Sequence, residues 1–189
     1  FHEVIRELGY AGLGDLRFKD YIGRSDFDLW VDFIAKYKPP QSLNELLARK
    51  RQRVLEVMRE ARPIFEGLPG LVEKLAQVYP LAIASGSEHA VIQAVLAMGD
   101  LRRYFPIVVS SSDVKQGKPA PDIFLRAASM LKLNPKDCVV MEDSKPGVMA
   151  GLAAGMKVVA ITNTHPAAEL RAATHVVNSY EEIEQLLLG

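Results

Sequence analysis

The chain after Pro63 alternates short apolar runs with helical patterns, and this alternation restricts the fold more than any other feature. Helical patterns lie before, between and after most of the runs. Strands that alternate with helices are joined by right-handed crossovers, which make the strands of a sheet parallel. We therefore predict an α/β fold with a doubly wound parallel sheet. The apolar runs of strand length are residues 81–84, 107–109, 138–141, 158–161 and 175–177.

Before Pro63 only helical patterns occur. Apolar residues recur at helical spacing in residues 4–8 and again in residues 27–35, and a further short helix fits residues 15–22. Ser42 and Glu45 form a capping-box pattern at the start of a long helix. The basic run at residues 49–53 is interpreted as a solvated face of that helix.

The amino-acid composition limits the classes of molecule that the chain is expected to bind. The 189 residues are 49% hydrophobic and 24% charged, which suits one globular domain with an insertion. Basic and acidic residues balance to a net charge of zero, so we expect no nucleic-acid partner. No run reaches the roughly 18 apolar residues of a membrane span, and we expect no membrane partner. The single cysteine, Cys138, excludes a disulfide within the chain and fits a cytoplasmic location.

Three polar segments stand at or after strand ends. Each segment can also be explained without a functional role: as a serine that caps a helix, as a solvated lysine, and as a capping aspartate beside a surface glutamate. However, strands of an open parallel sheet bind ligands at their carboxyl ends, so the fold could bring these residues together. A hydroxyl, an ammonium and a carboxylate are the groups needed to hold a phosphoryl group and Mg²⁺. The segments are Ser85-Gly86-Ser87, Gly117-Lys118-Pro119 and Glu142-Asp143.

In their order and spacing these segments resemble the haloacid dehalogenase-like superfamily, in its branch of β-phosphoglucomutase-like and phosphoglycolate-phosphatase-like hydrolases. The resemblance implies a Rossmann-like core at residues 67–189 and an inserted α-helical cap at residues 10–66. Residues 1–9 then begin the helix that leads from core to cap. The matching pieces are Ala84-Ser85-Gly86-Ser87, Gly117-Lys118-Pro119-Ala120-Pro121-Asp122-Ile123-Phe124, and Met141-Glu142-Asp143-Ser144 with Gly147 and Ala150-Gly151.

The resemblance also implies roles. Ser85 is expected to be the phosphate-binding hydroxyl, assisted by Gly86 and Ser87, and Lys118 the cation that clamps the phosphate. The resemblance makes Asp143 a Mg²⁺ ligand, with Glu142 behind it or reaching the ion through water. Within these 189 residues, Ser85 and Lys118 are the expected catalytic residues. The Lys118-Pro119 peptide bond is expected to be cis, as in relatives.

One part of the family pattern does not appear in these 189 residues. The family's nucleophile and its general acid/base lie in an Asp-x-Asp loop after a first strand, and that strand belongs at the centre of the sheet. We expect the parent protein to contain this N-terminal segment. The alternative is a non-catalytic protein that keeps the pocket to bind a phosphorylated ligand.

Cap and loop residues bear on the substrate. In relatives the segment around Arg24 faces the active site, and mutase-like members place an arginine where Asp26 stands here. Glu88 and His89 would lie near the far end of the substrate, although His89 is interpreted as an ordinary helix-surface histidine. We therefore expect a phosphatase of a small phosphorylated metabolite, a sugar phosphate or phosphoglycolate-like compound, working through an aspartyl-phosphate. A phosphoryl mutase is the alternative enzyme, and a monomer or weak dimer is expected.

Overall fold

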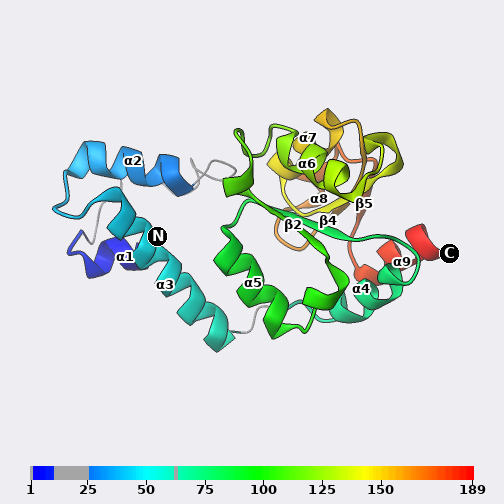
Figure 1. Cartoon of the computed structure of the whole chain (residues 1–189), viewed down its shortest axis with the longest axis horizontal. Helices are drawn as coiled ribbons and strands as arrows, with labels where there is room; N and C mark the ends of the chain where they lie inside the picture. Colours follow the sequence, from blue (N-terminus) through cyan, green and yellow to red (C-terminus); the bar gives the residue numbers. More distant parts are fainter. Residues whose placement is uncertain (1, 11–25, 62–63) are drawn as a thin grey trace. The chain divides into compact units, whose positions relative to one another are not determined.

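The computed structural model describes residues 2–10, 26–61 and 64–189 (Figure 1). The chain divides into two compact units, Phe1–Arg62 and Pro63–Gly189. The helix expected at residues 15–22 lies outside the described residues. The assignment of the first unit as a cap, with its boundary at residue 66, stays a prediction.

The described part of the first unit is helical. Its elements are α1 (His2–Glu7), α2 (Asp26–Tyr37) and α3 (Leu43–Ala61). The predicted capping box opens α3, because Glu45 Oε2 accepts the Ser42 N–H at 2.7 Å. Buried side chains from all three helices form one hydrophobic cluster of Val4, Ile5, Trp30, Phe33 and Leu46.

The second unit alternates strands and helices, as its sequence predicts. Its first half contains α4 (Leu68–Ala76), β1 (Ala82–Ser85), α5 (His89–Met98), η2 (Arg102–Tyr104), β2 (Ile107–Ser110), η3 (Ser111–Asp113) and α6 (Asp122–Leu131). Its second half contains η4 (Pro135–Asp137), β3 (Val139–Glu142), α7 (Lys145–Ala153), β4 (Lys157–Ile161), α8 (Ala167–Leu170), β5 (His175–Val177) and α9 (Tyr180–Leu188).

All strand pairs of the described residues are parallel, which confirms the predicted parallel α/β fold. The strands form two ladders rather than one continuous sheet: β1 with β2, and β3-β4-β5 in that order. Within the described residues, β1 and β3 each pair with one neighbour and keep one unpaired edge. Local sequence patterns indicate which segments are strands, but they do not show which strands are hydrogen-bonded to each other. These unpaired edges therefore do not follow from such patterns.

Successive side chains of a strand point to opposite faces. Helices cover both of these faces. On one face α6 and α7 pack against side chains from both ladders, so a single hydrophobic cluster joins them. On the other face α4 and α9 cover β4 and β5, and α4 and α5 cover β1 and β2. This is the doubly wound arrangement that the sequence predicts.

Strand β3 departs from this pattern on one face. Val140 and Glu142 are buried on the face of α6 and α7, whereas Val139 and Met141 on the other face are 44% and 37% exposed. No helix in the described parts of the chain is long and apolar enough to cross a membrane.

Candidate phosphate and metal site

The predicted site residues of the second unit lie at the carboxyl ends of the strands. Ser85 ends β1 and Glu142 ends β3. Lys118 lies in the loop between η3 and α6, which follows β2. The peptide bond between Lys118 and Pro119 is cis, as predicted. Strand ends of a parallel sheet are the usual binding edge of such folds.

A charge pair joins two of these strand ends. The Lys118 ammonium is hydrogen-bonded to Glu142 Oε1, and only 16% and 7% of the two side chains are exposed. The same ammonium lies 4.9 Å from the centre of the Phe124 ring, on α6, which adds a cation–π contact. Because a buried charge without a partner is costly, each of these groups requires the other.

The second oxygen of Glu142 is held by the turn that follows it. Oε2 accepts hydrogen bonds from Asp143 N at 2.8 Å and from the Ser144 N and Oγ, both at 2.9 Å. Burial of Glu142 acts to raise its pKa, but the charge of Lys118 and these hydrogen bonds outweigh burial and hold the pKa below its usual range. Glu142 is therefore a carboxylate whose two oxygens are both occupied by donors of the chain.

Gly147 leaves the space that this carboxylate fills. A Cβ atom at position 147 would lie 2.0 Å from the carboxylate carbon of Glu142, a distance that no real contact reaches. Ser144 caps α7, because its Oγ accepts the Gly147 N–H at 3.2 Å. The short Ser-x-x-Gly start of α7 thus brings the helix onto the Glu142 carboxylate.

Asp143 is oriented by the loop after β4. The Thr164 hydroxyl lies 2.8 Å from Asp143 Oδ2 and 3.0 Å from the Asp143 carbonyl oxygen, and His165 Nδ1 lies 3.0 Å from the same carbonyl. Sequence reasoning missed Thr164 and His165. The available signal was their place, because they follow the last residues of a predicted strand, where the other site residues also stand.

The described residues fit a magnesium site only in part. A carboxylate oxygen is the kind of ligand that Mg²⁺ prefers, and within the described residues Asp143 Oδ1 accepts no hydrogen bond from the chain. Glu142, with both oxygens occupied, fits a position behind the ion. Among the described residues no group of three or more His, Cys, Asp or Glu could hold a metal by itself. The ion would thus need water, substrate or further protein ligands.

The Ser85-Gly86-Ser87 segment connects β1 to α5. Ser85 Oγ accepts the Ser87 N–H at 3.2 Å, so the Ser85 hydroxyl keeps its proton to donate to a ligand. The Ser87 carbonyl accepts a hydrogen bond from Ser110, which ends β2. His89 is not only a surface residue of α5, because its Nε2 lies 2.8 Å from Asp113 Oδ2.

Among the predicted site residues, the structure shows direct contact only for some within its described parts. Lys118 contacts Glu142, and Asp143 follows Glu142, whereas Ser85 ends a strand of the other ladder. Arg24, the expected substrate-binding residue of the cap, lies outside the described residues.

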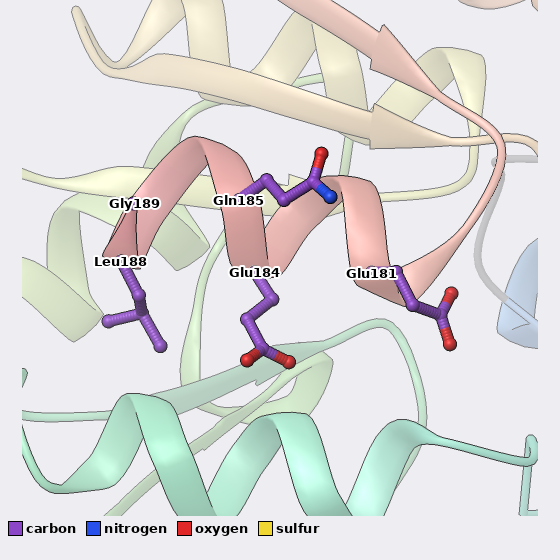
Figure 2. A pocket seen from close by; sticks show the side chains of 5 residues that line it. All are labelled: Glu181, Glu184, Gln185, Leu188 and Gly189. Atoms are coloured by element: carbon purple, nitrogen blue, oxygen red, sulfur yellow. The ribbon is translucent and has the colours of Figure 1, made fainter.

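A hollow of about 360 Å³ lies elsewhere, along the C-terminal helix α9 (Figure 2). None of the predicted site residues lines it; the lining residues are Glu181, Glu184, Gln185, Leu188 and Gly189. Glu184 points toward α4 in Figure 2, where Lys74 Nζ lies 2.7 Å from its Oε1. Two glutamates make this hollow unsuitable for a phosphate.

Comparison with known proteins finds relatives that are named as phosphatases. It is 44% identical over 110 residues to the bifunctional riboflavin kinase/FMN phosphatase of Arabidopsis thaliana, covering 58% of this chain and 27% of that protein. It is 48% identical over 80 residues to the fructose-1-phosphate phosphatase YqaB of Escherichia coli, covering 42% of this chain and 43% of that protein. The chain therefore spans less than half the length of either relative.

A solved structure has the same fold. The putative β-phosphoglucomutase of Thermotoga maritima superposes with a TM-score of 0.71 at 26% identity, over 98% of this chain and 88% of that one. The family model described as haloacid dehalogenase-like hydrolase matches residues 1–161. With relatives that are phosphatases and a neighbour named as a β-phosphoglucomutase, the chain belongs to the haloacid dehalogenase-like hydrolase family.

Proposed function

We propose that the protein is a Mg²⁺-dependent phosphatase of a small phosphorylated metabolite. The observation that carries the proposal is the Lys118 ammonium, buried at the carboxyl ends of the strands and bonded to Glu142, next to Asp143. An ammonium has three N–H donors, and the pair with Glu142 uses one of them. A lysine fixed in this way is suited to hold a phosphoryl oxygen whose charge grows in the transition state.

The other groups complete a phosphate site. Ser85 offers its hydroxyl proton, and the start of α5 offers backbone N–H groups, which favour an anion. Asp143 would hold Mg²⁺, which when bound withdraws negative charge from the phosphoryl oxygens. Thr164 keeps the Asp143 carboxylate in place by its hydrogen bond to Oδ2.

For the nucleophile we propose an aspartate on a strand outside these 189 residues, lying between β1 and β3. The unpaired edges of these two strands within the described residues support this, as do the exposed Val139 and Met141 of β3. The aspartate oxygen attacks phosphorus and the P–O bond to the substrate breaks, which gives an aspartyl-phosphate, while the general acid expected in the same segment protonates the leaving oxygen and releases the alcohol. Water then attacks that phosphorus, releases inorganic phosphate and restores the carboxylate.

For the substrate we propose a sugar or polyol phosphate. The relatives at 44% and 48% identity are named for FMN and fructose 1-phosphate, which both carry a phosphate on a polyhydroxylated chain. A mutase would instead return the phosphate to a sugar, as the name of the Thermotoga maritima protein suggests. Release of inorganic phosphate, without formation of a sugar phosphate isomer, separates the two reactions.

The test is replacement of Lys118 in the full-length protein. Lys118→Ala is expected to lower kcat for release of phosphate from fructose 1-phosphate by about 10²–10³-fold, the usual effect of losing one such donor. Lys136→Ala, which removes an exposed lysine in η4, is the control and is expected to keep full activity. An active Lys118→Ala variant would refute the assigned site.

Lys118→Ala leaves the Glu142 carboxylate buried without its cation, which can unfold the protein. The double variant Lys118→Ala/Glu142→Gln removes both charges and keeps the test valid. Circular dichroism establishes that each variant is folded before its activity is measured. Full activity in a folded double variant would also contradict the proposal.

A further inference from the structure

Two hydrogen bonds hold the segment Ser85-Gly86-Ser87 against the end of the neighbouring strand. Ser110 Oγ donates to the Ser87 carbonyl oxygen at 2.8 Å. On the other side of Glu88, the His89 Nε2 lies 2.8 Å from Asp113 Oδ2. Both contacts come from residues 110–113, where β2 ends and η3 begins.

Ser110 is the fixed side of this arrangement. It is completely buried, and it pairs in register with Ser85 across the β1–β2 ladder. Its N–H donates to Asp113 Oδ2 at 2.8 Å, the same oxygen that His89 contacts. The hydrogen bond from Ser110 and the contact with His89 lower the pKa of Asp113, so this residue is a carboxylate that accepts from both.

We propose that Ser110, Asp113 and His89 are positioning residues that hold the phosphate-binding segment in shape. This inference rests on the proposed function, because it assumes that Ser85-Gly86-Ser87 binds the phosphate of the substrate. Ser110 fixes the direction of the Ser87 carbonyl, and His89 fixes the first turn of α5 that follows. We call these three residues the strand-end clamp.

The clamp acts on the phosphate through Ser85. Ser87 N donates to Ser85 Oγ at 3.2 Å, and this leaves the Ser85 hydroxyl proton to donate elsewhere. If Ser87 moved away from Ser110, its N–H would move with it, and the Ser85 hydroxyl would lose that donor and its fixed direction. An ordered donor binds an anion more tightly than a mobile one, because less conformational entropy is lost on binding. The clamp therefore affects binding of phosphate more than turnover.

The experiment compares variants of the full-length protein with inorganic phosphate as the probe. Its dissociation constant is measured by calorimetry, and KM and kcat are measured with fructose 1-phosphate. Ser110→Ala is expected to weaken phosphate binding about fivefold, the effect of one lost hydrogen bond. His89→Ala is expected to weaken it about threefold, since His89 is 46% exposed. In both variants KM rises by a similar factor and kcat stays nearly constant.

Two further variants separate positioning from general stability. His89→Gln keeps an N–H donor for Asp113, and it is expected to restore most of the phosphate affinity. His175→Ala removes an exposed histidine at the start of β5, the end of the strand opposite to the site, and it is expected to change nothing. Unchanged phosphate affinity in both Ser110→Ala and His89→Ala would overturn the clamp. Loss of affinity that His89→Gln does not restore would overturn the role of His89.

Lys118→Ala distinguishes failure of the clamp from failure of the proposed function. If Lys118→Ala weakens phosphate binding while the clamp variants bind normally, only the clamp is wrong. If Lys118→Ala also binds phosphate normally, the proposed function fails. Ser110 is buried, so its variant can fail to fold; His89 is half exposed, and its two variants then decide the matter.

Discussion

At the scale of single residues, the site depends on one glycine. The Glu142 carboxylate occupies the place of a side chain at position 147, and it is there that Glu142 meets Lys118. A larger residue at 147 would have to move a buried, charged group that four donor atoms hold. The glycine is therefore a requirement of the charge pair, not of the backbone conformation of α7.

Gly147→Ala tests this requirement. The added Cβ would lie 2.0 Å from the Glu142 carboxylate carbon, so we expect a loss of about 1–3 kcal/mol in the free energy of unfolding, measured by urea denaturation. Gly70→Ala in α4 is the matched control, because its added Cβ meets nothing within 4 Å. Alanine favours a helix over glycine, so the control should be as stable as the parent or more stable. Equal stability of the two variants would contradict the close packing at Gly147.

Part of the site could be predicted from single residues, and part could not. Lys118, Glu142 and Asp143 follow predicted strands, so their common edge could be inferred from the fold. The bond between Lys118 and Glu142 could not, since residues 24 positions apart show no local pattern. Thr164 was missed because a neutral hydroxyl in a loop has no pattern of its own, and only its place after a predicted strand indicated it. The roles assigned to Ser85, Arg24 and the metal ligands stay predictions.

At the scale of elements, helix α7 supports the site through its first turn. Ser144 caps the helix by accepting the Gly147 N–H and also donates to Glu142 Oε2. Ser179 caps α9 by accepting the Glu182 N–H at 3.2 Å, the same distance as in α7. The two serines thus have the same role in their helices, but only Ser144 touches the site.

This pair of caps gives a matched comparison. Ser144→Ala and Ser179→Ala are each expected to cost about 1 kcal/mol of stability, seen as a fall of about 2–4 °C in Tm. Only Ser144→Ala is expected to raise KM for the phosphorylated substrate, because Glu142 loses a hydrogen bond and holds Lys118 less firmly. An equal change of KM in both variants would show that the effect comes from stability alone.

Elements were easier to predict than their pairing. The alternation after Pro63 gave each strand within a few residues of its observed bounds, since short apolar runs between helices have few other solutions. The break between the β1–β2 and β3–β4–β5 ladders does not follow from local patterns, because backbone pairing joins segments that are far apart in the chain; only the family resemblance, with its central strand outside these residues, indicated it.

At the scale of the whole molecule, each unit has hydrophobic clusters of its own. Trp30 and Leu46 are completely buried in the cluster of the first unit, and Val158 is completely buried in the second. Trp30 is the single tryptophan of the sequence, so its fluorescence reports on the first unit. Far-UV circular dichroism reports on both units.

In a protein of this sequence, a core mutation in one unit should therefore shift the tryptophan-fluorescence midpoint and the circular-dichroism midpoint by different amounts. Leu46→Ala is expected to cost about 2–5 kcal/mol in the first unit and to lower the urea midpoint of tryptophan fluorescence. Val158→Ala should lower the midpoint seen by circular dichroism and leave the fluorescence midpoint nearly unchanged. If each mutation shifted both midpoints equally, the two units would unfold together and the expectation would be wrong.

The bond between Lys118 and Glu142 has a consequence for how a ligand arrives. Seen from a distance, the two opposite charges form a dipole, whose field falls off faster than that of a single cation, and the chain as a whole carries no net charge. Beyond the Debye length of about 8–10 Å, little attraction remains to guide an anion through solution. A phosphate would reach this site by random encounter, and the lysine would act only on contact. Its rate of association should therefore depend little on ionic strength.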